Sequence, residues 1–338
     1  RKRHNLNIQQ KAHVTRVIFR GKRAIGVEYI QKGQTKTVHA RAEIILSGGA
    51  INSPQLLQLS GIGPGKLLQS HNINIVHVSH HVGKNLQDHL GSDIYYHANV
   101  PTLNQELNPM FGKLRAGLKY IFTRKGPLSL SLNQGGGFIQ IDPNASGPDL
   151  QLYFSPVSYT RAPAGVRPLM NPDPFPGFLM GFNPCKPTSV GNIQISSTDP
   201  MLPPKIYSNY LDTDYDKKMM IEGIRLIRRI ANAPALNSII KDELAPGVGI
   251  KSETDIAKYI RQKAWSVFHP CSTCRMGSNP NVSVVDPKLR VHGVDNLRVV
   301  DASIFPTIPT GNINAPSIMV GEYASDIILK DARNQKGL

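Results

Sequence analysis

Residues 42–60 read AEIILSGGAINSPQLLQLS, and this stretch decides the fold. Its apolar run at 42–47 predicts a buried strand that ends in a pair of glycines. Ser53 and Pro54 predict the opening of a helix, because proline suits the first helical turn. A strand, glycines and a helix in this order let backbone amides approach a phosphate or a cofactor closely. The same order also serves as a tight packing turn, and the stretch alone does not choose between the two.

The residues before this stretch predict a strand-rich start. Runs at 12–19, 24–30 and 35–40 are typical of strands, and 20–23 predicts a turn between the first two. Glycines between 61 and 65 predict the end of the helix. This glycine segment does not form a phosphate loop, because Leu67 follows Lys66 where a serine or threonine is required.

Between about residues 95 and 212 the sequence is dense in proline and glycine. Short runs at 137–141, 150–154, 177–182 and 191–197 predict strands of an antiparallel sheet in a second domain. Thr213 then predicts the cap of a helix. We interpret the apolar face of this helix as core, since its members recur at helical spacing: Met220, Ile224, Ile227 and Ala231.

The C-terminal segment predicts a strand at 297–300, a turn rich in proline and threonine at 306–310, and a further helix. Pro316 opens this helix, which we expect to run to about residue 329. Asn312 and Asn314 therefore stand at a helix N-terminus. The helix dipole and the unpaired N–H groups there favour negative charge.

One histidine lies in a setting suited to acid–base chemistry. His269 belongs to the run WSVFHPCSTCRMG at 265–277, where Pro270 fixes the turn that follows it. An imidazole titrates near neutral pH and can take a proton from a bound hydroxyl. Most loop histidines catalyse nothing, so this motif gains weight only from the others in the chain.

Length and charge limit the classes of protein. The 338 residues suffice for one large or two ordinary domains. No apolar stretch approaches the roughly 18 residues of a membrane span. The net charge of +16 could indicate nucleic-acid binding. The basic residues are spread out and no nucleic-acid module surrounds them, so we favour a solvated basic surface and expect no nucleic-acid partner.

The cysteines, the glycosylation-type sequons and the start of the chain bear on metal binding and on the cellular compartment of the protein. Cys185, Cys271 and Cys274 are too few for a disulfide framework, and the C-x-x-C pair lacks the further ligands of a zinc site, so we expect no metal. Glycosylation-type sequons at Asn144 and Asn281 are compatible with a secreted protein. The chain begins RKRH, so we expect it to be a piece of a longer polypeptide whose targeting segment lies upstream.

Several motifs in the same order resemble the glucose–methanol–choline family of flavin oxidoreductases over nearly the whole chain. GAINSPQLLQLSGIG at 49–63 is similar to that family's second signature at every constrained position. VGKNLQDH at 82–89 resembles the segment that normally follows. Further short motifs resemble those of the family: DP at 199–200, PP at 203–204, NY at 209–210, VDP at 285–287, VVDAS at 299–303 and NAP at 314–316. The glucose-dehydrogenase-like and choline-dehydrogenase-like branches are nearest.

The resemblance implies an α/β fold, α+β overall. It combines part of an FAD-binding Rossmann-like domain with an antiparallel-sheet substrate domain and flanking helices. We expect the FAD-binding domain at 1–94, the substrate-binding domain at 95–262, and the C-terminal part of the FAD-binding domain, with the catalytic pair, at 263–338.

The resemblance also implies the catalytic residues. His269 is similar to the base that takes the hydroxyl proton of the substrate, and Asn312 to the second active-site position, which holds histidine or asparagine among relatives. The implied reaction is FAD-dependent oxidation of the CH–OH group of a sugar or another alcohol, with hydride transfer to flavin N5. A quinone or oxygen would then accept the electrons.

Other positions resemble cofactor contacts. Asn314 matches a contact at the head of the last helix, Asp301 and Ala302 match the segment along the phosphate–ribitol region, and Val14 matches a backbone contact at the adenine end. His89 is expected to order its own segment and to take no part in catalysis.

Two departures leave an alternative open. The family's Gly-x-Gly-x-x-Gly loop is absent, so we expect this isolated piece to be inactive without the missing part. The alternative is a catalytically inactive relative that acts as a binding or structural protein, and an intact glycine loop upstream would favour the enzyme. Cys271 and Ser272 replace an aliphatic residue and a glycine that are frequent in relatives.

Overall fold

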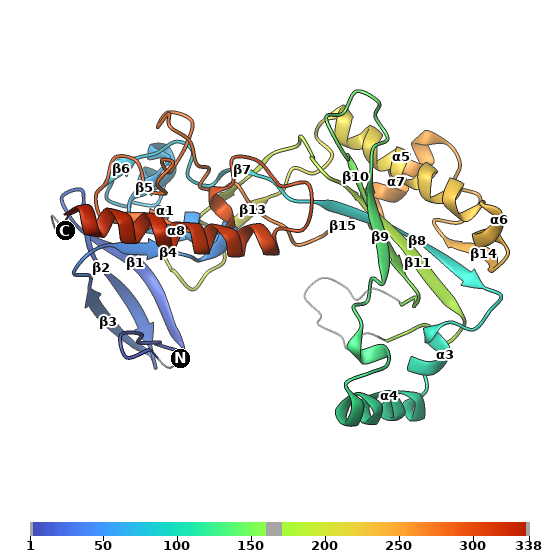
Figure 1. Ribbon diagram of the computed structural model, residues 1–338. Helices are drawn as coiled ribbons and strands as arrows, with labels where there is room; N and C mark the ends of the chain where they lie inside the picture. Colours follow the sequence, from blue (N-terminus) through green and yellow to red (C-terminus); the bar gives the residue numbers. More distant parts are fainter. Residues whose placement is uncertain (1–2, 160–170, 336–338) are drawn as a thin grey trace. The chain divides into compact units, whose positions relative to one another are not determined.

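A computed structural model describes residues 3–159 and 171–335 (Figure 1). The chain divides into two compact units. Unit 1 contains Arg1–Asp88, Ser189–Tyr210 and Phe268–Leu338, and unit 2 contains His89–Thr188 and Leu211–Val267. The chain therefore passes between the units repeatedly, and unit 1 is assembled from three distant segments. Each unit is a mixture of helices and strands, which confirms the predicted α/β class.

The first sheet of unit 1 follows the predicted strands closely. Its antiparallel order is β1-β2-β3, with β1 at Ala12–Arg20, β2 at Arg23–Gln31 and β3 at Gln34–His39. Gly21 adopts a φ of 59° in the turn between β1 and β2, a conformation that suits glycine. Val17 and Ala24 point into the core of this unit.

Residues 42–60 form a strand and a helix as expected, but the helix begins earlier than the predicted start at Ser53 and Pro54. β4 (Ile44–Leu46) pairs in parallel with β16 (Leu297–Val299), and α1 spans Gly49–Leu59. Pro54 therefore lies inside α1 rather than in its first turn, which corrects the predicted start. Proline has no N–H to give the carbonyl of Ala50 four residues earlier. The hydroxyl of Thr273 donates to that carbonyl at 2.6 Å instead, so a distant side chain makes the longer helix possible.

The strand predicted at 191–197 lies in a different unit from the one expected. β12 (Gly191–Gln194) belongs to the sheet β13-β12-β7 of unit 1, with β13 at Lys205–Tyr207 and β7 at Lys84–Leu86. Gln58, fully buried on α1, donates to the carbonyl of Ile193 at 3.1 Å and accepts from the amide of Ile195 at 2.8 Å. Segment 189–210 is thus anchored to unit 1 by hydrogen bonds, whereas the sequence placed it within 95–262.

The remaining elements of unit 1 are short, apart from the last helix. They are β5 (Ile62–Gly63), α2 (Gly65–Ser70), β6 (His77–Val78), the 3₁₀ helix η2 (Ala302–Ile304) and α8 (Asn314–Gln335). α8 begins two residues before Pro316 and continues past the predicted end at 329. Proline is accommodated here because the first helical N–H groups have no intrahelical acceptor.

Unit 2 is built on the antiparallel sheet that the sequence predicted. Its strand order is β14-β8-β11-β10-β9, and β15 also pairs with β8. The strands are β8 (Leu90–Ala98), β9 (Gly135–Ile139), β10 (Leu150–Ser155), β11 (Gly177–Pro184), β14 (Ile240–Ala245) and β15 (Trp265–Ser266). Every residue of β11 is buried, as expected for a central strand that is covered on both faces.

Helices cover part of this sheet. α5 (Asp214–Ala231) is capped by Thr213 as predicted, and its predicted apolar face is buried. A Cβ added at Gly223 would lie 2.1 Å from a ring carbon of Phe182, so glycine permits the close packing of α5 on β11. The other helices are α3 (Leu103–Leu107), α4 (Met110–Thr123), η1 (Pro127–Ser129), α6 (Pro234–Asn237) and α7 (Glu253–Lys263). Among the described residues, none of the helices combines the length and apolarity needed to cross a membrane.

Candidate active site

The loop that carries His269 is fixed by a carboxylate. Asp88 accepts a hydrogen bond from the backbone amide of His269 at 2.7 Å, and the hydroxyl of Tyr210 donates to its other oxygen. Backbone hydrogen bonds between Gln87 and Cys271 hold the two segments side by side. These contacts place the imidazole without using either of its ring nitrogens.

The structure brings the two predicted catalytic residues together. Asn312 Nδ2 lies 3.1 Å from His269 Nε2, although 43 positions separate the residues in the chain. An amide nitrogen can only donate, so Nε2 accepts and the imidazole is neutral in this arrangement. His269 is buried, with 8% of its surface exposed. The side chains thus form a desolvated base beside a neutral hydrogen-bond donor.

Burial sets the protonation state of His269. Desolvation lowers the pKa of its imidazole below the ordinary histidine value, and the negative charge of Asp88 acts in the opposite direction. The net effect is a lowered pKa. The ring is therefore neutral near pH 7, which is the state that a general base requires.

Asp301 joins the end of β16 to the start of α1. One carboxylate oxygen accepts from the amide of Gly49 at 2.9 Å and from the hydroxyl of Ser53 at 2.5 Å, and the other accepts from the amide of Ser303 at 2.8 Å. A carboxylate at a helix N-terminus is stabilised by the unpaired N–H groups there. Asp301 thereby fixes the glycine turn between β4 and α1.

The segment after Asp301 is also tied to the histidine loop. The carbonyl of Ala302 accepts from the amide of Ser272 at 3.2 Å, and the carbonyl of Ser303 accepts from the amide of Cys274 at 2.8 Å. Asn314 is the first residue of α8, two positions after Asn312, and its side chain is exposed. The segment that contains Asp301 and Ala302 is therefore hydrogen-bonded to the loop that carries His269.

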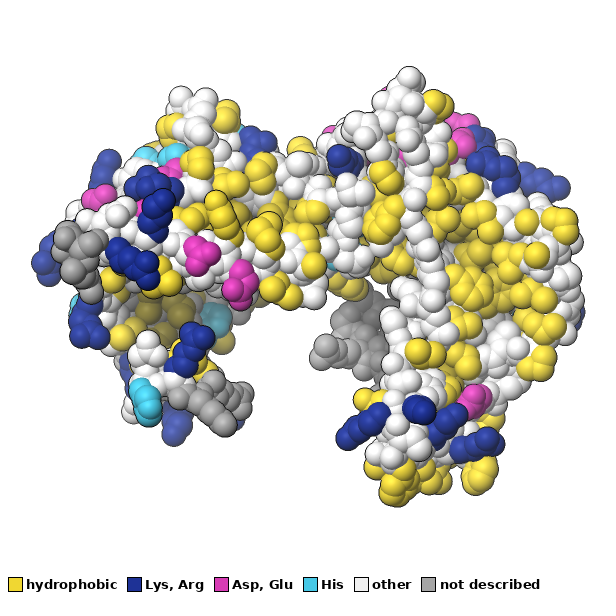
Figure 2. Space-filling model, in the orientation of Figure 1, with side chains coloured by type: hydrophobic (Ala, Val, Ile, Leu, Met, Phe, Trp, Pro, Cys, Tyr) yellow, Lys and Arg dark blue, Asp and Glu magenta, His cyan; other side chains and the backbone are white. Residues whose placement is uncertain are grey.

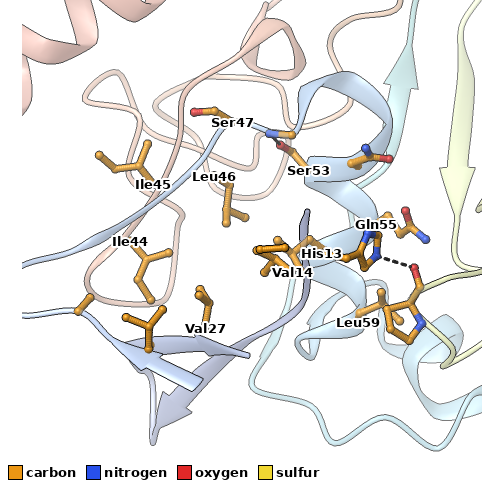
Figure 3. Close-up of a pocket in the computed structure, with 18 of the residues that line it drawn as sticks. His13, Val14, Val27, Ile44, Ile45, Leu46, Ser47, Ser53, Gln55 and Leu59 are labelled. Carbon is orange, nitrogen blue, oxygen red and sulfur yellow. Dashed lines mark hydrogen bonds between the residues drawn. The ribbon is translucent and has the colours of Figure 1, made fainter. Parts of the chain in front are cut away.

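A cavity of about 550 Å³ lies beside β1, β2, β4 and α1 (Figure 3). Val14, Val27 and Leu46 surround it, and Ser47, Gly48 and Ser53 also belong to its lining. A Cβ added at Gly49 would meet nothing within 4 Å, so the space beside the turn is open. Apolar walls with polar groups at one end suit a flat heteroaromatic ring joined to a polar chain. The predicted contact Val14 thus lines a cavity that reaches Ser53, a partner of Asp301.

Three residues that position this site had no predicted role. Asp88 stood inside the motif at 82–89 but received no role, and Tyr210 and Thr273 were likewise overlooked. Their hydrogen-bonding capacity was visible, but their partners are far away in the chain, so no spacing rule could find them. His89 contacts the carbonyl of Cys185 at 2.9 Å and is fully buried, which agrees with an ordering role within unit 2.

The cysteines are free and buried. Burial raises the pKa of Cys271 and of Cys185 to about 12 and also raises that of Cys274, so all three are thiols at neutral pH. Among residues 3–159 and 171–335, no group of three or more His, Cys, Asp or Glu side chains is placed to hold a metal ion. The groups of this site suited to proton transfer and hydrogen bonding are therefore the imidazole of His269 and the amide of Asn312.

The chain belongs to the GMC oxidoreductase family. The N-terminal model of that family matches residues 1–91, and the C-terminal model matches residues 187–321. These matches confirm the resemblance that the motifs indicated, and they include both His269 and Asn312.

Several relatives are similar to this chain over almost its whole length. An alcohol dehydrogenase [acceptor] from Pseudomonas putida is 42% identical over 97% of the chain and 59% of its own length. The mitochondrial choline dehydrogenase of Homo sapiens is 41% identical over 96% of the chain and 54% of its own length. A solved formate oxidase from Aspergillus oryzae, studied for modification of its FAD, has a TM-score of 0.87 at 27% identity and covers 96% of this chain and 60% of its own. The chain thus spans less than two thirds of the length of these relatives.

Proposed function

We propose that the protein is an FAD-dependent oxidoreductase that oxidises the CH–OH group of an alcohol, with His269 as the catalytic base. The observation that carries this proposal is the 3.1 Å contact between the buried His269 and the exposed Asn312. Membership of the GMC family and the similarity to alcohol and choline dehydrogenases support it. The proposal concerns the whole protein, of which this chain supplies the base and part of the cofactor site.

The cofactor site would use the residues that surround the glycine turn. Val14 and its apolar neighbours would contact the adenine end, and the segment Asp301–Ala302 and Asn314 would lie along the rest of the cofactor. The open space beside Gly49 and the cavity of about 550 Å³ fit this assignment. FAD, when bound, accepts the two electrons that leave the alcohol carbon.

The chain's own residues move the proton. The neutral Nε2 of His269 takes the proton of the substrate hydroxyl, which leaves the oxygen more electron-rich and its carbon easier to oxidise. With an alcohol bound, the amide of Asn312 would donate to the substrate oxygen instead of to Nε2, which frees the Nε2 lone pair for the proton. Asp88 holds the loop through the backbone, so the ring keeps its position while its charge changes.

The substrate would be a sugar or another alcohol, and the acceptor a quinone or oxygen. The relatives point to both an alcohol and choline as substrate classes, so a panel must contain each. The alternative is a catalytically inactive relative that binds ligands. These two functions differ in one measurable property, the reduction of bound flavin by an alcohol.

The full-length, flavin-loaded protein should lose its yellow absorbance when mixed anaerobically with a true substrate. A panel of sugars, primary alcohols, aromatic alcohols and choline, followed at the flavin absorbance maximum, measures this directly. Bleaching by one class with a saturating concentration dependence supports the enzyme. Retained flavin with no bleaching by any class, together with chemical reduction by dithionite, supports the inactive binding protein instead.

Asp88→Asn should move the acidic limb of the pH profile of kcat/KM to lower pH. The charge of Asp88 raises the pKa of His269, so its removal should lower that pKa further and leave the base neutral in more acidic solution. Asparagine keeps an oxygen that can accept from the amide of His269. Steady-state rates measured from about pH 5 to 8, the range in which histidine titrates, test this.

Tyr210→Phe is the matched control for this charge effect. It removes the hydroxyl that donates to Asp88 but keeps the carboxylate, so it should not shift the acidic limb downward. An acidic limb that stays in place in Asp88→Asn would mean that it reports a group other than His269.

Export of the protein is a separate proposal. Both sequon asparagines, Asn144 and Asn281, are exposed, which supports accessibility to glycosylation. Glycosidase treatment of the protein from its native source, followed by mass spectrometry, tests it.

A further inference from the structure

α4 exposes a continuous apolar face. At about 100° per residue, its large apolar side chains fall within roughly 120° of arc. Phe111 and Phe122 are 77% and 81% exposed, and the other members of this face are also exposed: Met110, Leu114, Leu118 and Ile121. Leu128 and Leu130, in and after the adjoining η1, add further exposed apolar surface. A helix of a globular protein ordinarily turns such a face inward.

The side of α4 opposite the apolar face has small residues at its closest contacts. Ala116 is buried, and a Cβ added at Gly112 would lie 1.9 Å from the carbonyl oxygen of Glu106. The helix therefore packs on α3 through close backbone approach and directs its large side chains outward. This contact favours the observed orientation of α4, because a larger side chain at position 112 would clash with the backbone of Glu106.

The charges beside this face have one sign. The basic residues are Lys113, Arg115, Lys119, Arg124 and Lys125, and no acidic residue occurs between Glu106 and Asp142. Arg115 and Lys119 follow one margin of the apolar face, and Lys113 lies beyond the other. Figure 2 shows hydrophobic side chains gathered at the outer edge of the α4 segment, with lysine and arginine side chains beside them. Long basic side chains at such margins can reach lipid headgroups while their stems cover apolar surface.

We propose that α4 is an interfacial helix that binds the surface of an anionic lipid bilayer. Its outward face would enter the boundary between headgroups and acyl chains, and its basic margins would contact the anionic headgroups. With 14 residues it is shorter than the roughly 20 residues of a spanning helix, so it would lie in the plane of the membrane. The charge complementarity favours an anionic bilayer over a second copy of this chain, because two copies would bring like charges together. This inference does not depend on the proposed alcohol oxidation.

Vesicle flotation of the full-length, flavin-loaded protein tests the proposal. The protein should float with vesicles of phosphatidylcholine and phosphatidylglycerol and much less with vesicles of phosphatidylcholine alone. Combining Phe111→Ser with Phe122→Ser should lower the partition coefficient about tenfold or more, since it removes the deepest apolar contacts. Lys119→Gln should lower it about fivefold, and added salt should reduce that difference.

Phe138→Ser is the matched control, because Phe138 is an exposed phenylalanine on β9, outside α4. It should float like the unchanged protein. Circular dichroism and flavin absorbance establish that each variant is folded. Equal flotation of the double variant and the unchanged protein would overturn the proposal. So would absence of flotation, as expected if another segment covers α4, or sedimentation as a dimer that the double variant converts to a monomer.

Discussion

His269→Ala should slow the reduction of bound flavin by the alcohol about 10²–10⁴-fold, the usual cost of losing a general base. The variant should still fold and bind FAD, because the hydrogen bond from residue 269 to Asp88 comes from the backbone and survives the substitution. The amide of Asn312 also remains, so the loss reports the proton acceptor. Anaerobic stopped-flow mixing with the substrate identified in the panel measures the rate.

The control for this variant is His80→Ala. His80 is exposed and has no place in the proposed site, so its replacement should leave flavin reduction unchanged. The pH profile gives a second readout, since the acidic limb assigned to His269 should disappear in His269→Ala. A reduction rate equal to that of the unchanged protein would show that another group takes the proton.

Arg298→Met should destabilise unit 1 by about 3–5 kcal/mol, the range seen when one partner of a buried ion pair is removed. The Arg298 side chain is 4% exposed and donates to Glu43 at 2.6 Å, to Asp331 at 2.9 Å and to the carbonyl of Lys288 at 2.6 Å. Methionine preserves much of the volume but leaves these acceptors without their donor. Because Arg298 lies on β16, the loss should also weaken FAD retention. Denaturant titration followed by flavin release and far-UV circular dichroism measures both.

Arg290→Met provides the comparison. Arg290 pairs with Asp286 at 2.6 Å, but its side chain is 55% exposed, and exposed pairs are worth about 0–1 kcal/mol. A similar loss of stability in both variants would mean that burial of Arg298 is not what matters.

Acidification should reduce the difference in the free energy of unfolding between Arg298→Met and the unchanged protein. Hydrogen bonding to Arg298 lowers the pKa of Asp331 in the folded state. The associated stability is present above the ordinary aspartate pKa of about 3.9 and is lost as pH falls through the lower folded value. If the difference in the free energy of unfolding stays constant over this pH range, the destabilisation in Arg298→Met comes from lost packing alone.

Local patterns predicted most of the secondary structure because strands and helices depend on the period of apolar residues. The sheet β1-β2-β3, the cap at Thr213 and three strands of unit 2 (β9, β10 and β11) lie close to their predicted positions, whereas β8, β14 and β15 were not predicted. The start of α1 was wrong, because the residues that permit it are Asp301 and Thr273, more than 200 positions away. Segment 189–210 was placed in the other unit for a similar reason, since Gln58 anchors it.

The sequence by itself determined the family, the α/β class and the two residues that we propose for catalysis, because these are written in motifs of fixed residue type and order. Only the tertiary structure decided that His269 and Asn312 touch, that Asp88 holds the loop, and that the large apolar residues of α4 face outward. The physical reason is that hydrogen bonds and packing depend on distances in space. Residues that are far apart in the chain meet only once the backbone has folded.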